Sequence, residues 1–417
     1  MLKTSIQNFR VHVRDPLYRN SYFWVADMAA VGFFGMLYWF LAARLEVPGT
    51  VGLATSVAGT LTLISVLSRV GLDVLLLRNL PRASPGQFRR MFNHAMLIAG
   101  ALSVVGALVA YFLLPRAAPE LLPLASGGMA LLVFTIFALT WTENFLLESA
   151  LAASRKTVWI FAKDVAQGLL RLPLLWVLAP DFGAVGIIVA YFFPSLLTVA
   201  LLIGKVLPAV VPGYSFGLAW GGIELRFLSS LAANYAVALV NNLPVSVGSL
   251  VILWRFGAEA TALYYVLWMV GSLTLMAPVA LARSSLVEMA RKSETKAPAY
   301  AKPLLISGAL AACVFVVALV VLPLFGTHYA QGGMLALLPF ALAALPAVFQ
   351  QLRIAQLRAA GQDAALLAIV GLAIGGFLLL IATAPIQVEF IGWLYFVSIS
   401  VAAVVGRFIP VHATFSE

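Results

Sequence analysis

Long apolar segments separated by short polar ones dominate the chain. The apolar segments run to about 20 residues with few charges, the length with which an α-helix crosses a hydrocarbon layer of about 30 Å. Strands of a membrane barrel would be about half as long and would alternate polar and apolar residues. Backbone groups in lipid must be hydrogen-bonded within the protein, so such segments form helices that pack as a bundle. The pattern predicts an all-α polytopic membrane protein.

The limits of the apolar segments predict about twelve membrane-spanning helices. The first six cover residues 22–43, 50–72, 94–114, 122–147, 158–179 and 183–206, and the others cover 228–253, 258–282, 304–324, 333–349, 364–382 and 390–409. The hexamers at 59–64 and 271–276 are similar and fall at equivalent places, which indicates a duplicated six-helix unit. We therefore expect an N-terminal lobe with an interfacial N-terminal helix (1–206), a cytoplasmic linker (207–222) and a C-terminal lobe (223–417).

Composition and charge support a membrane location. Hydrophobic residues make up 63% of the chain and charged residues 10%, against about 25% charged residues in soluble domains. The net charge of +10 does not indicate nucleic acid, because the basic residues form short clusters between apolar segments. Most of the 26 Lys and Arg residues, Lys163 included, lie on one side of the predicted helices, while only Arg44, Arg116 and Arg255 lie in loops on the other. The positive-inside rule then places both termini in the cytoplasm, with the helices in the cell membrane.

Nine short blocks, which together extend over nearly the whole chain, carry a family resemblance. They are YWFLAARL (38–45), VGLA (51–54), GLD (71–73), RNLP (78–81), RK (155–156), RLPLL (171–175), FGAEA (256–260), FGTHYA (325–330) and LPA (345–347). The sequence resembles the polysaccharide-biosynthesis (Wzx-type) lipid-linked oligosaccharide flippases of the multidrug/oligosaccharidyl-lipid/polysaccharide (MOP) exporter superfamily. The resemblance implies two six-helix, MATE-like lobes around a central cavity. It also implies transport of an oligosaccharide on a polyprenyl diphosphate from the cytoplasmic to the outer leaflet, driven by an ion gradient.

Two arginines near or within the predicted spans are candidates for binding the substrate's diphosphate. Arg69 and Asp73 are separated by four residues and share a helical face, as do Asp164, Gln167 and Arg171. A guanidinium group is always ionised and presents a fork that matches phosphate oxygens. By the resemblance, Arg171 is the basic position of the Arg/Lys-Leu-Pro block. The alternative is structural: Arg69 pairs with Asp73, and Arg171 braces the bundle through Asp164.

Two further acids and two amides are candidate cavity residues. Asp27 and Glu143 lie in spans without a neighbouring base, so they are candidate coupling groups for H⁺ or Na⁺, with Asp73 and Asp164 as further cavity charges. A structural carboxyl group, partnered by an arginine of another helix, is equally consistent with the sequence. Asn234 and Asn241 can bind sugar hydroxyl groups, although polar residues also join helices within a bundle.

The function that these features favour is a flippase for a lipid-linked oligosaccharide, in contact with membrane lipids and working beside a polymerase or glycosyltransferases. A MATE-like cation or drug antiporter is the first alternative, and it would favour an acid-lined cavity. An integral-membrane transferase is the second, but the Asp and His residues form no catalytic or metal-binding motif, and the only cysteine, Cys313, lies in an apolar segment. We therefore expect no enzymatic activity, no cofactor, no metal and no nucleic-acid partner.

Overall fold

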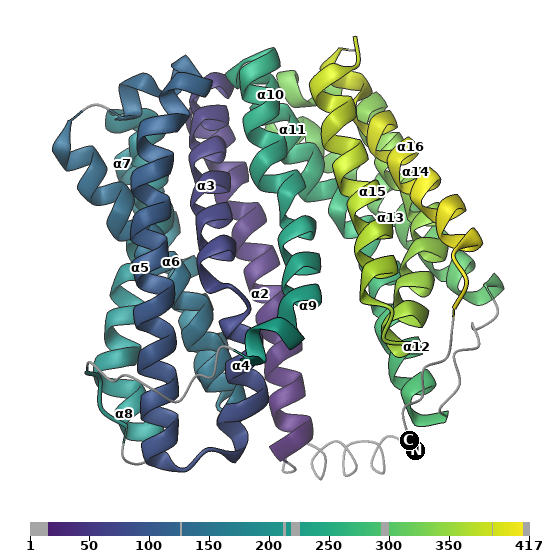
Figure 1. The fold of residues 1–417 in the computed structure, drawn as a ribbon. Helices are drawn as coiled ribbons and strands as arrows, with labels where there is room; N and C mark the ends of the chain where they lie inside the picture. The colour runs from purple at the N-terminus through teal and green to yellow at the C-terminus, as the bar shows by residue number, and fades with distance from the viewer. Residues whose placement is uncertain are drawn as a thin grey trace, which may run out of the picture. The chain divides into compact units, whose positions relative to one another are not determined.

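The computed structural model describes residues 16–125, 127–211, 214–217, 226–292, 300–385 and 387–411, and every element assigned within these ranges is helical (Figure 1). Within them, eleven segments are long and apolar enough to cross a membrane. This confirms the predicted fold class, a multi-pass α-helical membrane protein. Residues 1–15 of the predicted interfacial helix lie outside the described ranges.

The difference between twelve predicted spans and eleven observed segments comes from α7 (Thr157–Leu201). Gly183 inside it has a non-helical backbone (φ 53°, ψ −127°), a left-handed φ that glycine adopts without strain. The Nε of Arg171 reaches the carbonyl oxygen of Tyr191 at 2.9 Å, whereas 20 residues of straight helix would separate them by about 30 Å. The element is therefore a helical hairpin that contains both the fifth and the sixth predicted spans.

The chain forms two compact units. Unit 1 consists of residues 1–46 and 61–235, and unit 2 of residues 47–60 and 236–417. Unit 1 holds α2 (Pro16–Leu45), the end of α3 (Pro48–Arg69), α4 (Leu72–Asn79), α5 (Pro85–Ala117), α6 (Gly128–Ala153), α7, α8 (Leu207–Val210) and the start of α9 (Arg226–Leu243). Unit 2 holds the start of α3, the end of α9, α10 (Ser249–Phe256), α11 (Ala258–Ser272), α12 (Met276–Lys292), α13 (Ala301–Phe325), α14 (Thr327–Ala359), α15 (Asp363–Thr383) and α16 (Ile391–Phe408). Residues 47–60 thus join a different unit from the chain on either side, whereas the predicted lobes were continuous.

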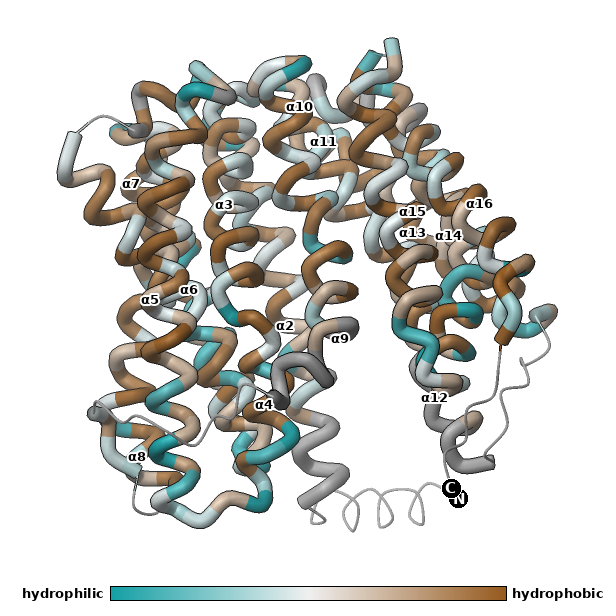
Figure 2. The backbone as a smooth tube through the Cα atoms, viewed as in Figure 1, coloured by the Kyte–Doolittle hydropathy of each residue, from teal (hydrophilic) through white to brown (hydrophobic). Residues whose placement is uncertain are grey.

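Helix ends in unit 1 follow local sequence signals. Ser84 caps α5 by accepting a hydrogen bond from the Gln87 backbone N–H, Gln87 Oε1 accepts one from the Ser84 backbone N–H, and Pro85 occupies the first turn. At the end of α3 the chain turns through Val70 (φ 46°) and Gly71 (φ 79°), so the second predicted span ends earlier than expected. Figure 2 shows hydrophilic residues gathered around α4 and the adjacent end of α5, while hydrophobic residues dominate the rest of α5.

Unit 2 is held by close helix approaches and by two arginines at helix ends. A Cβ atom on Gly392 of α16 would lie 2.2 Å from the carbonyl oxygen of Ala336 in α14, so only glycine permits this contact. Arg353 of α14 donates to the carbonyl oxygens of Gly406 and Ile409, and Arg255 of α10 similarly donates to those of Ile381 and Ala384. The last carbonyl groups of a helix lack partners within the helix, and these guanidinium groups supply them.

Candidate functional site

A buried polar network in unit 1 is centred on Lys163 of α7. Its ammonium group donates to Glu148 Oε1 at 2.6 Å, to Asp164 Oδ1 at 2.6 Å and to Asn144 Oδ1 at 3.0 Å. The Lys163 side chain is 0% exposed, and those of Glu148 and Asp164 are 21% and 11% exposed. Burial of a charge is costly unless it is paired and hydrogen-bonded, and all three ammonium hydrogens have an acceptor here.

The α6–α7 hairpin explains why these residues meet. The two helices are joined by a turn at residues 154–156, so positions at similar distances from that turn face each other. Glu148 and Lys163 are one such pair, and Asn144 and Gln167 are another, joined by a hydrogen bond of 3.2 Å. This network was not predicted, because Lys163 was counted with the basic residues on the cytoplasmic side of the helices. The nearly equal spacing of Glu148 and Lys163 about the Ser154–Lys156 turn is the sequence signal that could have found it.

Arg171 forms no ion pair with Asp164, whose Oδ1 lies 2.6 Å from Lys163 Nζ. Its Nε donates to the carbonyl oxygen of Tyr191, its Nη2 donates to Gln167 Oε1 at 3.3 Å, and its guanidinium carbon lies 4.1 Å from the centre of the Tyr191 ring. Arg171 is only 8% exposed. It therefore joins the two arms of the α7 hairpin, and its role toward a diphosphate stays a prediction.

Arg69 and Asp73 form the ion pair that their spacing allows. Arg69 Nη1 lies 2.9 Å from Asp73 Oδ2, although the two residues stand on successive helices, α3 and α4. The Arg69 guanidinium carbon also lies 4.4 Å from the centre of the Phe145 ring, and Arg69 interacts electrostatically with Glu148. The pair is therefore connected by charge to the Lys163 network.

The two isolated acids have different surroundings. Asp27 of α2 interacts electrostatically with Asp164 of α7, and its buried Oδ1 has no hydrogen-bond partner among the described residues. Glu143 of α6 is buried, and its Oε2 has no hydrogen-bond partner among the described residues. A Cβ atom on Gly100 of α5 would come within 3.0 Å of Glu143 Oε1, so Glu143 faces α5 across a tight contact.

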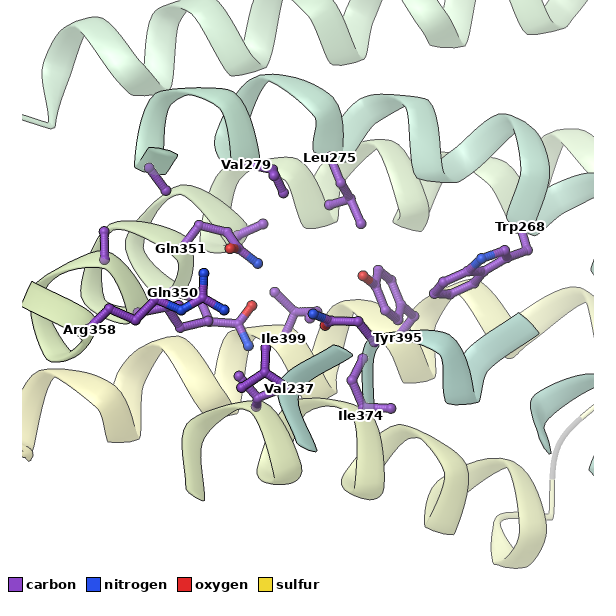
Figure 3. A pocket seen from close by; sticks show the side chains of 16 residues that line it. Val237, Trp268, Leu275, Val279, Gln350, Gln351, Arg358, Ile374, Tyr395 and Ile399 are labelled. Atoms are coloured by element: carbon purple, nitrogen blue, oxygen red, sulfur yellow. The ribbon is translucent and has the colours of Figure 1, made fainter. Parts of the chain in front are cut away.

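Unit 2 contains a cavity of about 340 Å³ between α9, α11, α12, α14, α15 and α16 (Figure 3). Asn241, one of the predicted residues, lines it, whereas the side chain of Asn234 lies outside the described residues. Gln350, Gln351 and Arg358 of α14 gather at one end, and Trp268 and Tyr395 lie toward the other. The sequence analysis missed the α14 residues, although Gln351 and Arg358 are seven positions apart and thus share a helical face.

The lining of this cavity has a distinct charge character. None of its sixteen lining residues is acidic, and Arg358 is the only one that carries a full charge. Amide groups offer both donors and acceptors, and the arginine offers donors alone, so the cavity suits hydroxyl groups and anions. Within the described ranges, no group of three or more His, Cys, Asp and Glu side chains could hold a metal ion.

Neither a family model nor a curated protein matches the sequence. Solved structures of MATE transporters do match the fold. A multidrug resistance MATE transporter of the MOP superfamily, inward-facing, gives a TM-score of 0.61 at 15% identity, covering 93% of this chain and 92% of that chain. The Vibrio cholerae MATE transporter VcmN in its bent form gives 0.56 at 16% identity, covering 94% of each chain. A MATE protein in complex with MaD3S gives 0.56 at 14% identity, covering 95% of this chain and 96% of that chain. The chain therefore has the fold of the MATE transporters of the MOP superfamily.

Proposed function

We propose that this chain is a membrane transporter that carries a polyprenyl-diphosphate-linked oligosaccharide from the cytoplasmic to the outer leaflet of the cell membrane. A diphosphate and a hydrated glycan cannot enter hydrocarbon without a large desolvation cost, whereas the prenyl chain is soluble there. The transporter supplies a polar path for the head group by alternating access, and no covalent step is needed. The MATE fold supports a transporter, and the family resemblance supports this substrate.

One observation carries the choice of substrate: the unit 2 cavity has no acidic residue. Its side chains include the amides of Asn241, Gln350 and Gln351, which suit sugar hydroxyl groups, and Arg358, which suits a phosphate. In the proposed topology, with both termini cytoplasmic, the Arg358 end of α14 faces the cytoplasm, where the substrate is made. A cavity for cationic drugs would need a carboxylate to compensate their charge.

Ion coupling is assigned to unit 1. Its polar network contains three basic and four acidic side chains: Arg69, Lys163, Arg171, Asp27, Asp73, Glu148 and Asp164. With all seven ionised, one negative charge is left without a counter-charge in a largely buried region. One proton, held between the carboxyl groups of Asp27 and Asp164, neutralises the network. Glu143 is a second proton carrier in this proposal, and Arg69 and Arg171 are the candidate diphosphate ligands of unit 1.

The second candidate function is a MATE-like cation antiporter. The observation in its favour is Asp27 of unit 1, whose buried Oδ1 has no hydrogen-bond partner among the described residues and, in the ionised carboxylate, could bind a cationic substrate. The two functions make opposite demands on the unit 2 cavity, because an added negative charge impedes a diphosphate and attracts a cation.

Proteoliposomes that contain the purified chain separate the two functions. A polyprenyl-diphosphate oligosaccharide would be followed by its accessibility to an impermeant glycan-modifying enzyme, and ethidium uptake would report cation transport. We expect glycan transport in the wild type, at least a tenfold loss in Gln350→Glu, and near wild-type transport in Gln350→Asn. The control is Gln87→Glu, an exposed site where a carboxylate still fits the capping box. Ethidium transport that rises in Gln350→Glu, without glycan transport, would assign the antiporter function instead.

A further inference from the structure

The Lys163 ammonium group occupies a position that is built like a cation site. Its three acceptors are two carboxylate oxygens, from Glu148 and Asp164, and one amide oxygen, from Asn144, all within 3.0 Å of Nζ. They come from both arms of the α6–α7 hairpin. Carboxylate and amide oxygens are also the ligands that hard metal cations take in proteins.

We propose that Lys163 is a tethered cation that fills this oxygen cage, so that unit 1 is closed to Na⁺. This deepens the ion-coupling part of the proposed function, because it leaves protons as the only ions that unit 1 can exchange. The ammonium group is covalently attached and fully buried, so its local concentration far exceeds that of any ion in solution. A free cation would have to displace it and leave it without an acceptor.

The residues around the cage agree with this role. Gln167 Nε2 donates to the same Asn144 oxygen at 3.2 Å and to Thr198 Oγ1 at 2.7 Å. These bonds fix the Asn144 side chain with its amide oxygen toward Lys163. The other charged groups near the cage are Asp27, which interacts with Asp164, and Arg69, which interacts with Glu148. Asn144 also donates to Glu148 Oε1 at 2.8 Å, so two of the three acceptors have a hydrogen-bond partner besides Lys163.

The test measures cation binding on the purified full-length protein and does not depend on glycan transport. Thermal unfolding is recorded in NaCl and in choline chloride at equal ionic strength. For the wild type we expect the same melting temperature in both salts. For Lys163→Met, which keeps the length of the side chain but removes its charge, Na⁺ should raise the melting temperature by about 3 °C when present at ten times its dissociation constant. The matched control, Lys205→Met, replaces an exposed lysine of the same unit and should respond as the wild type does.

Further substitutions tie the response to the cage. In the Lys163→Met background, Glu148→Gln together with Asp164→Asn removes both carboxylate ligands and should abolish the Na⁺ effect. If Lys163→Met does not yield folded protein, Lys163→Met with Glu148→Gln removes both members of one ion pair and should still respond to Na⁺. The proposal is overturned if Na⁺ stabilises the wild type, or if the folded variant without the Lys163 charge does not distinguish Na⁺ from choline. If the wild type transports no glycan while Lys163→Met still responds to Na⁺, that result counts against the proposed function alone.

Discussion

Replacement of Arg171 by methionine should destabilise unit 1 by about 3 kcal/mol. Arg171 Nε donates to the Tyr191 carbonyl oxygen at 2.9 Å, and Nη2 donates to Gln167 Oε1 at 3.3 Å. A hydrogen bond from a charged group contributes about 1.5–3 kcal/mol, and the longer one contributes less. The contact with the Tyr191 ring adds about 0.5–2 kcal/mol. Methionine recovers part of the apolar packing of the arginine stem, which brings the net loss to the lower end of these sums.

The measurement is thermal unfolding of the purified protein in detergent, with glycan transport in proteoliposomes measured on the same preparations. A loss of about 3 kcal/mol corresponds to a fall in melting temperature of about 6–12 °C for a unit of this size. Arg171→Lys keeps the charge but cannot bridge both acceptors, so it should fall between the wild type and Arg171→Met. Arg90→Met, at an exposed position of α5, is the control and should stay within about 0.5 kcal/mol of the wild type.

A melting temperature of Arg171→Met equal to that of the wild type would refute the structural reasoning, because the hairpin would then not depend on this side chain. The transport data answer a separate question. If Arg171 also binds the diphosphate, folded Arg171→Met transports no glycan even well below its melting temperature, and Arg171→Lys retains part of the activity. If Arg171 only joins the arms of the hairpin, both variants transport glycan at the wild-type rate while they remain folded.

Three further predictions concern packing and buried charge. Lys163→Met should lower the free energy of unfolding, measured by chemical denaturation, by about 3–5 kcal/mol. Adding Glu148→Gln should recover part of this loss, because it removes a buried carboxylate that has lost its partner. Gly392→Ala should lower the melting temperature and increase the distance between α14 and α16, since its Cβ would lie 2.2 Å from the Ala336 oxygen. A variant as stable as the wild type would show that the two helices can separate without loss of stability. Arg353→Met should speed hydrogen exchange at the C-terminal end of α16 without affecting α13, and unchanged exchange there would count against the capping role.

The candidate sites show where sequence reasoning succeeded and where it failed. The four-residue spacing of Arg69 and Asp73 indicated an ion pair, and they form one, because such spacing brings side chains together even across the short break between α3 and α4. Asn241, a candidate cavity residue, lines the unit 2 cavity, and its binding of sugar hydroxyl groups stays a prediction. Arg171 and Asp164 share a helical face but do not pair: Asp164 binds Lys163, and Arg171 binds the Tyr191 carbonyl oxygen and Gln167.

The sequence by itself determined that this chain is a helical membrane protein, because the length and apolarity of each segment leave no other way to satisfy backbone groups in lipid. It also determined local features such as the cap of α5, since these depend on neighbouring residues. Only the tertiary structure decided that Lys163 is buried between two acids and that residues 47–60 join unit 2. Those outcomes depend on which helix faces which, and the partners that stabilise a buried charge lie on helices that sequence periodicity cannot pair.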